Sequence, residues 1–210
     1  LDYPALVKGI AERMDYARYI DIFQQLSLSS YYRTDSHWRQ EEIIKAARHL
    51  ALEMGVNLSA EYTVKTSEVP FYGVYYGQAA LPLPPDQLQY LQAAFLENVR
   101  AYDYETSAHI PIYDLDAAGG DDPYEMFLCG PKSLIEIENP AASTGRELII
   151  FRDSFGSSIA PLLAEGYEKI TLVDIRYISP AMLDKFISFK GQDVLFLYSS
   201  SVLNNSSTIK

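Results

Sequence analysis

A serine that follows a predicted buried strand is the residue best suited to act as a nucleophile. The apolar run Glu147–Phe151 predicts a strand, Ser154 comes shortly after it, and a short helix is expected over 157–165. In α/β folds, ligands bind at the carboxyl ends of strands, where N–H groups at a helix start can also hold an oxyanion. The simpler alternative for this segment alone is that Asp153 or Ser154 caps the helix.

A candidate base and its partner lie in a polar, aromatic-rich loop predicted over 29–38. Asp35 and His37 are two residues apart, so in an extended segment their side chains project to the same side. Asp35 could then accept the Nδ1–H of His37 and leave Nε2 free to take a proton from a serine. The alternative is that Asp35 or Ser36 begins the helix expected over 39–54 and that His37 only packs nearby.

The first half of the chain alternates between helix and strand signals. A helix is expected from Pro4 to residue 17, a short strand over 19–26, and an amphipathic helix over 39–54 that Gly55 ends. An extended pair is expected over 61–80. After it, Asp86 is expected to cap a second helix, whose buried stripe would be Leu88, Leu91, Phe95 and Val99.

The final third of the chain carries the clearest pattern, whereas 101–139 shows little periodicity. Buried strands are expected over 147–151, 169–175 and 194–198, separated by helices over 157–165 and 180–189. Apolar strands that alternate with short helices imply an α/β domain with a parallel sheet covered on both faces. No linker divides the chain, so we predict one domain over 1–210.

The composition is that of a globular protein and excludes several classes of function. Hydrophobic residues make up 48% of the chain, and no apolar stretch is long enough to span a bilayer. There are 17 Lys and Arg against 28 Asp and Glu, and the net charge of −11 argues against nucleic acid as a partner.

Metal and disulfide chemistry lack the residues that they require. The lone Cys129 permits no internal disulfide, and the three histidines, including His49 and His109, are too scattered for a zinc site. The acidic pairs at 114–116 and 121–122 lack the spacing of a calcium-binding loop. We therefore predict no metal site, and the serine chemistry considered above needs no cofactor.

Seventeen tyrosines form an unusual feature, with runs at 31–32, 72–76 and 102–104. Aromatic rings that carry a hydroxyl suit sugar rings, although packing inside strands would explain most of them. Three arginines could form a local positive rim that admits an anionic polymer despite the net charge: Arg33, Arg152 and Arg176.

Together these segments resemble the DHHW protein family. YYRTDSHW (31–38) resembles the motif that names the family, with Ser36 in place of the first histidine. The resemblance continues in FYGVYYGQ (71–78), DPYEMFLCG (122–130) and RDSFGSSIAPLLAEGYEKITLVDIRYI (152–178). The family looks like a branch of the SGNH-hydrolase-like proteins and is related to the alginate O-acetylation proteins, which carry Asp-x-His and a later serine.

This resemblance implies an SGNH-hydrolase-like three-layer sandwich with a mainly parallel sheet. It also implies a Ser-His-Asp triad in which Ser154 is the nucleophile, His37 the general base and Asp35 the residue that orients it. Oxyanion donors would be Gly73, Gly130 or the backbone after Ser154. We expect the substrate to contact six residues: Tyr32, Arg33, Trp38, Tyr72, Gly73 and Arg152.

The implied activity is serine-dependent acyl transfer to a polysaccharide of the cell envelope, outside the membrane. A membrane partner would deliver the acetyl group, and the chain would correspond to the C-terminal part of longer, membrane-anchored relatives. Three alternatives stay open: a carbohydrate acetyl esterase, in which water takes the acyl group, a non-catalytic module that binds glycans, and a scaffold in an envelope complex.

Overall fold

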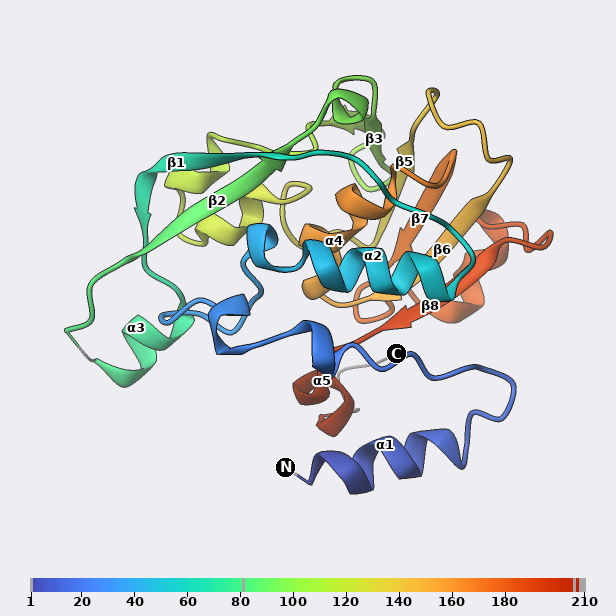
Figure 1. Ribbon diagram of the computed structural model, residues 1–210, viewed down its shortest axis with the longest axis horizontal. Helices are drawn as coiled ribbons and strands as arrows, with labels where there is room; N and C mark the ends of the chain where they lie inside the picture. The colour runs from blue at the N-terminus through green and yellow to red at the C-terminus, as the bar shows by residue number, and fades with distance from the viewer. Residues whose placement is uncertain (1, 81, 206, 208–210) are drawn as a thin grey trace.

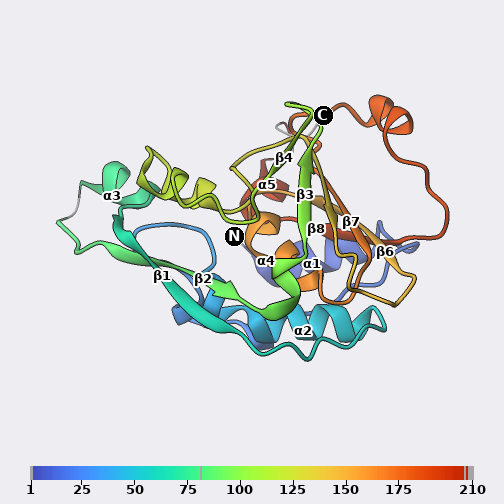
Figure 2. The same cartoon turned by 90° about the horizontal axis from the view of Figure 1, so that it is seen from above.

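Two separate β-sheets organise the chain in the computed structural model, which describes residues 2–80, 82–205 and 207. The larger sheet has six strands in the order β4-β3-β5-β7-β6-β8, and β1 and β2 form a two-stranded ribbon (Figure 1). The ribbon reaches away from the central sheet towards α3 (Figure 2).

The six-stranded sheet is mixed. Its strands are β3 (Arg100–Asp103), β4 (Ala108–Ile110), β5 (Leu134–Glu138), β6 (Glu147–Arg152), β7 (Lys169–Val173) and β8 (Asp193–Leu197). Only the pairings of β6 with β7 and with β8 are parallel, whereas β3 with β4, β3 with β5 and β5 with β7 are antiparallel. The α/β class is confirmed, but a mainly parallel sheet is not. The antiparallel half is built largely from 101–139, where the pattern was weak, and the short β3–β4 connection permits only an antiparallel pair.

The helices are short. The α-helices are α1 (Tyr3–Ala11), α2 (Ile44–Glu53), α3 (Val74–Ala79), α4 (Phe155–Leu163) and α5 (Ser200–Asn204). Tighter 3₁₀ turns are η1 (Phe23–Gln25), η2 (Leu28–Ser30), η3 (Gln40–Glu42), η4 (Ala94–Glu97), η5 (Ala117–Gly119), η6 (Pro123–Met126) and η7 (Pro180–Lys185). Within the described residues, no helix has the length and apolar character needed to cross a membrane.

Alternate residues of the central strand β6 pack on opposite faces of the sheet, as the two-residue period of a strand requires. Leu148 and Ile150 join the core beneath α2 and α4. Ile149 and Phe151 join a second core that includes Leu183 of η7. Both faces of β6 are therefore covered, which explains its continuous apolar sequence.

The largest correction concerns the helix expected after Asp86. Residues Asp86–Gln92 form strand β2, which pairs antiparallel with β1 (Thr63–Phe71). Leu88 and Leu91 fit the spacing of a helix, but Leu88 and Tyr90 also alternate with exposed or half-exposed glutamines. Pairing with a distant strand decides between the two patterns, and local spacing contains no trace of that pairing.

Other predicted elements are confirmed or corrected in part. The strands expected over 147–151, 169–175 and 194–198 are confirmed as β6, β7 and β8, to within two residues at each end. The expected strand over 19–26 is wrong, because its only regular structure is η1. The expected helices end early or change type: α1 ends at Ala11, 39–54 divides into η3 and α2, and 180–189 contains η7. Gly55 ends α2 as expected and has a φ of +79°.

Candidate active site

Ser154 lies at the corner between strand β6 and helix α4. Asp153 caps the helix, because its Oδ1 accepts the N–H of Phe155 at 3.0 Å, and its Oδ2 accepts the N–H of Ser199 at 2.7 Å. The cap interpretation therefore applies to Asp153. The hydroxyl of Ser154, which is half-buried, is left to interact elsewhere.

The loop that carries Asp35 and His37 is closed on itself. Tyr31 and Trp38 form an antiparallel bridge, and the N–H of Tyr32 donates to the carbonyl oxygen of His37 at 3.3 Å. The chain thus enters and leaves the loop side by side. This closure brings the side chains of Asp35 and His37 to the same side, as their spacing predicted.

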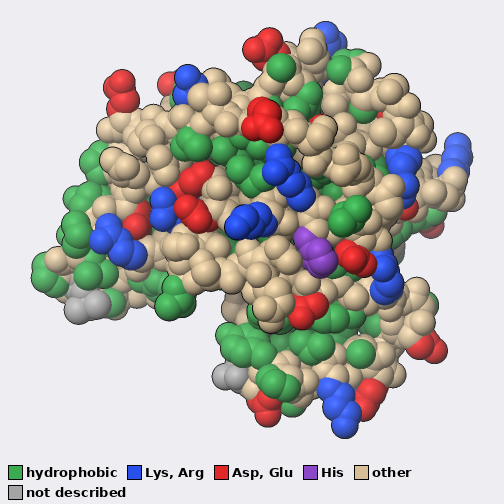
Figure 3. All heavy atoms as spheres, in the orientation of Figure 1, with side chains coloured by type: hydrophobic (Ala, Val, Ile, Leu, Met, Phe, Trp, Pro, Cys, Tyr) green, Lys and Arg blue, Asp and Glu red, His purple; other side chains and the backbone are tan. Residues whose placement is uncertain are grey.

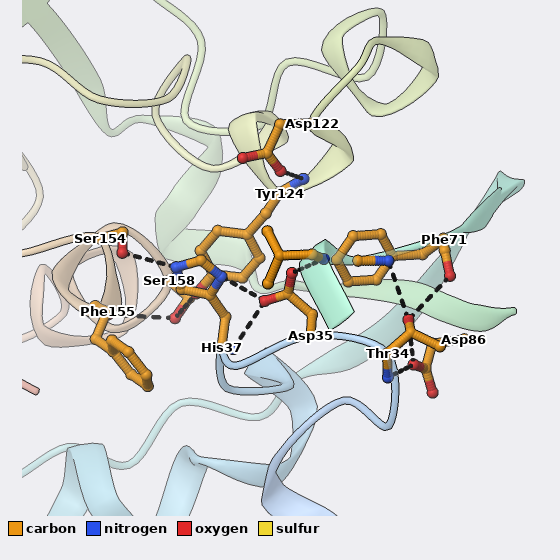
Figure 4. A network of polar contacts seen from close by, with 12 residues as sticks. Thr34, Asp35, His37, Phe71, Asp86, Asp122, Tyr124, Ser154, Phe155 and Ser158 are labelled. Carbon is orange, nitrogen blue, oxygen red and sulfur yellow. Dashed lines mark hydrogen bonds and ion pairs between the residues drawn. The ribbon is translucent and has the colours of Figure 1, made fainter. Parts of the chain in front are cut away.

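Three side chains form a continuous chain of hydrogen bonds (Figure 4). Asp35 Oδ1 lies 2.6 Å from His37 Nδ1 and also accepts the main-chain N–H of His37 at 2.9 Å. His37 Nε2 lies 2.7 Å from Ser154 Oγ. The Asp35 side chain is 1% exposed and that of His37 is 14% exposed. The carboxylate is thus sealed from solvent, while the imidazole and the alcohol remain accessible.

Electrostatics fix the direction of these hydrogen bonds. Burial raises the pKa of Asp35, but the hydrogen bond and the charge of His37, with the N–H groups of Val74 and His37, lower it by more. The net pKa lies below its usual value, so Asp35 is ionised at neutral pH and can only accept. In the neutral form of His37, this acceptor places the one ring proton on Nδ1, which leaves the lone pair of Nε2 directed at Ser154.

Tyr124, which no pattern in the sequence singled out, holds the ring of His37 in its plane. Its ring stacks on His37 with centroids 4.0 Å apart and an interplanar angle of 12°. Its buried hydroxyl donates to Ser158 Oγ on α4 at 2.8 Å. Tyr124 thereby connects the ring of His37 to the helix that follows Ser154. The only signal for it was its place in the block 122–130, because that region has no clear period.

Two aromatic residues expected to contact substrate lie in the core instead. Tyr32 packs edge-on against Phe71 and Tyr124, and Trp38 packs edge-on against Phe155. Both are buried. Their expected contact with substrate is therefore corrected to support of the loop and of the first turn of α4.

The arginines do not form the expected positive rim. Arg152 is 0% exposed, and it donates to the carbonyl oxygens of Asp153 and Lys132 and to Ser157 Oγ. Its guanidinium therefore supports the corner from inside and cannot contact a substrate. Arg176 is paired with Asp174 at 2.6 Å. Arg33 alone keeps an exposed side chain, and it pairs with Asp86.

The two remaining residues of the expected substrate set differ from each other. Tyr72 is 46% exposed, and its ring lies 4.7 Å from that of Tyr76. Gly73 is buried directly against the loop, where an added Cβ would overlap the Cβ of Asp35 and lie 2.5 Å from the carbonyl oxygen of Thr34. Tyr72 thus remains available to a ligand, whereas Gly73 is required by the close approach to Asp35.

The oxyanion donors expected from the sequence are already engaged. The N–H of Gly73 donates to Thr34 Oγ1, and the N–H of Gly130 donates to the carbonyl oxygen of Phe127. After Ser154, the N–H of Phe155 donates to the carboxylate of Asp153, and the N–H of Gly156 donates to its carbonyl oxygen. By contrast, the N–H of Ser154 has no hydrogen-bond partner among the described residues. It belongs to the residue that precedes the first turn of α4, the positive end of the helix.

Within the described residues, neither of the other two histidines forms a hydrogen bond with Asp35, His37 or Ser154. His49 is half-buried on α2, and His109 Nδ1 lies 3.2 Å from the carbonyl oxygen of Ala101. Within the described part of the chain, no three His, Cys, Asp or Glu side chains are arranged to hold a metal ion.

Comparison with known proteins gives one family and one fold. The sequence model of the family described as DHHW protein matches residues 20–173, which include the loop and the corner. A DHHW family protein from Eubacterium siraeum has a TM-score of 0.75 and 24% identity over 94% of this chain and 69% of that chain. No curated protein matches the chain.

A second solved protein, PatB1 of Bacillus cereus, is also similar. Its structure with a sulfonyl adduct has a TM-score of 0.61 and 20% identity, over 94% of this chain and 67% of that chain. A further structure of PatB1 has a TM-score of 0.62 over 92% of this chain and 68% of that chain. These likenesses show a shared fold.

Proposed function

The chain belongs to the DHHW protein family, and from this membership and the site geometry we propose that the protein transfers an acyl group through an ester on Ser154. The observation that carries the proposal is the pair of distances that join Asp35, His37 and Ser154, 2.6 and 2.7 Å. These are the contacts that a nucleophile, its base and the residue orienting the base require. The family resemblance suggests that this site is related to the active sites of SGNH-hydrolase-like proteins.

The proposed reaction has two halves. In the first, His37 Nε2 takes the proton of Ser154 Oγ while the oxygen attacks the carbonyl carbon of an acyl donor. The N–H of Ser154 is the donor that we propose for the resulting oxyanion. His37 then returns the proton to the leaving group, and the acyl group remains on Ser154.

In the second half, a hydroxyl group attacks the acyl-serine. His37 removes the proton of that hydroxyl, the new ester bond forms, and the proton returns to Ser154 Oγ as the serine is released. A sugar hydroxyl makes the protein an O-acyltransferase, whereas water makes it an esterase. The acyl donor would be supplied by a membrane partner at the cell envelope, as the family resemblance implies.

Exposed tyrosines beside the site support a carbohydrate acceptor. Tyr72, Tyr75 and Tyr76 are all exposed, and hydrophobic side chains gather at the end of the molecule that carries α3 (Figure 3). This segment adjoins the site, because the N–H of Val74 donates to Asp35 Oδ2 at 3.0 Å. Tyrosine rings offer a sugar both an apolar face and a hydroxyl. We propose that a polysaccharide chain lies along this segment while one of its hydroxyls reaches Ser154.

The function is tested by following the fate of an acetyl group. The protein is incubated with an activated acetyl ester, with and without a soluble oligosaccharide, and acetylated sugar and free acetate are measured by mass spectrometry and NMR. We expect sugar ester to form faster than free acetate. Ser154→Ala should lower both rates at least about 10³-fold. Ser188→Ala, which changes an exposed serine outside the loop and the corner, should leave them unchanged.

The other outcomes separate the alternatives. Free acetate without sugar ester would make the protein an esterase and would end the proposal of transfer. Equal rates for the wild type and Ser154→Ala would contradict the serine mechanism and favour a non-catalytic, glycan-binding role.

A further inference from the structure

A second buried carboxylate lies beyond Asp35, on the side away from His37 (Figure 4). It belongs to Asp86, the first residue of β2, and its Oδ2 accepts both the N–H and the hydroxyl of Thr34, each at 2.8 Å. Thr34 is fully buried. Neither Asp86 nor Thr34 forms a side-chain hydrogen bond with Ser154 or His37, so the acyl-transfer chemistry described above does not use them.

The hydroxyl of Thr34 connects Asp86 to the backbone that contacts Asp35. Its single proton is directed at Asp86, because that oxygen lies 2.8 Å away whereas the carbonyl oxygen of Phe71 lies 3.4 Å away. The hydroxyl oxygen is then free to accept, and the N–H of Gly73 donates to it at 3.0 Å. An ionised Asp86, which can only accept, therefore fixes which way this hydroxyl points.

The backbone held in this way meets the carboxylate of Asp35. The N–H of Val74, next to Gly73, donates to Asp35 Oδ2 at 3.0 Å, and the N–H of Tyr75 donates to the carbonyl oxygen of Thr34 at 2.9 Å. With Oδ2 held by Val74, the plane of the carboxylate is set and Oδ1 is directed at both N–H groups of His37.

We propose that Thr34 and Asp86 are positioning residues for the base. They hold the backbone at Gly73 and Val74, and that backbone sets the carboxylate of Asp35 in the plane in which it orients His37. The effect on rate rests on the proposed function, whereas the effect on the geometry of His37 does not. The charge of Asp86 agrees with this role. Burial raises its pKa, but hydrogen bonds from Thr34 and Arg33 lower it by more, so the carboxylate is ionised at neutral pH.

The test compares a substitution that removes the hydroxyl of Thr34 with one that keeps it. Thr34→Val keeps the shape of the side chain and removes the hydroxyl, which leaves the N–H of Gly73 and one lone pair of Asp86 without a partner. We expect kcat for the acetyl ester to fall about 10–100-fold, with KM within about twofold. Thr34→Ser restores the hydroxyl and should recover kcat to within about threefold. Thr66→Val, on the exposed side of β1 in the two-stranded ribbon, is the matched control and should change neither constant.

A second readout does not depend on turnover. The short Asp35–His37 hydrogen bond should give the Nδ1 proton of His37 a low-field ¹H NMR resonance. We expect this resonance in the wild type, Thr34→Ser and Thr66→Val, and its loss or upfield shift in Thr34→Val while the rest of the spectrum stays dispersed. If the protein transfers no acyl group, this resonance still tests the role of Thr34.

The proposal is overturned if folded Thr34→Val keeps both the wild-type kcat and the resonance. If Thr34→Val does not fold, Asp86→Asn decides, because the amide keeps an acceptor but removes the charge that fixes the hydroxyl. A folded Asp86→Asn with an unchanged resonance would also overturn the proposal, and a shifted resonance would support it.

Discussion

Two regions meet at the site, and they are built in opposite ways. The corner with Ser154 is regular: a buried strand ends, Asp153 caps the next helix, and Arg152 supports the turn from inside. The loop with His37 has no helix or strand of its own. In addition to the bridge between Tyr31 and Trp38 that closes it, contacts with distant segments fix its shape, through Tyr124 and through Asp86.

The difference separates the requirements of the proposed nucleophile, Ser154, from those of its proposed base, His37. The corner offers one oxygen, whose position follows from the ends of β6 and α4. The loop must instead fix the plane of a ring and the plane of a carboxylate, and four separate hydrogen bonds and a ring stack do so. We therefore expect changes on the loop side to act mainly on rate and changes behind the corner to act mainly on stability.

The largest effect should come from Asp35→Asn on the loop side. The amide can donate to Nδ1, which favours the tautomer that carries its proton on Nε2 and cannot accept from Ser154. We expect kcat to fall about 10³–10⁴-fold with the fold retained, as measured with the acetyl ester and by circular dichroism. A kcat within tenfold of the wild type would mean that Asp35 does not orient the base.

Substitution of one glycine in each region compares the two regions directly. In Gly73→Ala the new Cβ meets Asp35 and the main chain of Thr34, so the loop must move. In Gly156→Ala the Cβ lies 2.7 Å from Arg152 Cβ, behind the corner. We expect each to lower the free energy of unfolding by about 1–3 kcal/mol. Only Gly73→Ala should also lower kcat strongly, by about 100-fold.

Urea unfolding of both glycine variants measures the loss of stability, and kinetics with the acetyl ester measure the loss of kcat. Equal losses of kcat in the two variants would remove the distinction between the regions, and so would a larger loss in Gly156→Ala.

The loop should also make a distinct contribution to acid stability. Because the pKa of Asp35 in the folded protein lies below the usual 3.8, its carboxylate stabilises the fold above that value. This contribution is lost as the pH falls through the folded-state pKa. The difference in unfolding free energy between the wild type and Asp35→Asn should be constant above about pH 5 and shrink below pH 3.8. A difference that grows on acidification would contradict the assigned direction.

The smallest effect should come from the exposed tyrosines. Tyr72→Ser removes one ring from the surface beside Val74 and should raise KM for an oligosaccharide about 3–10-fold, with hydrolysis of the acetyl ester unchanged. Tyr16→Ser, which changes an exposed tyrosine outside the family blocks, is the control. An equal rise in KM for both variants would argue against a specific glycan surface.

The same contrast explains how much the sequence could predict. The corner was predictable because strand β6 and helix α4 are recorded in local runs of apolar residues. The spacing of Asp35 and His37 gave their shared direction, and the family blocks suggested that they meet Ser154. Asp86 was misassigned to a helix cap, since its partner Thr34 is distant in the chain and no local period records the pairing of β1 with β2. The burial of Tyr32, Trp38 and Arg152 also depends on such contacts.

The most direct test of the account is covalent labelling of the nucleophile. A sulfonyl fluoride forms a covalent bond with an activated hydroxyl and is therefore a suitable probe. Peptide mass spectrometry should find one adduct, on Ser154, in the wild type, and a labelling rate at least about 100-fold lower in His37→Ala. Equal labelling of the two proteins, or an adduct on another residue, would contradict the claim that His37 activates Ser154.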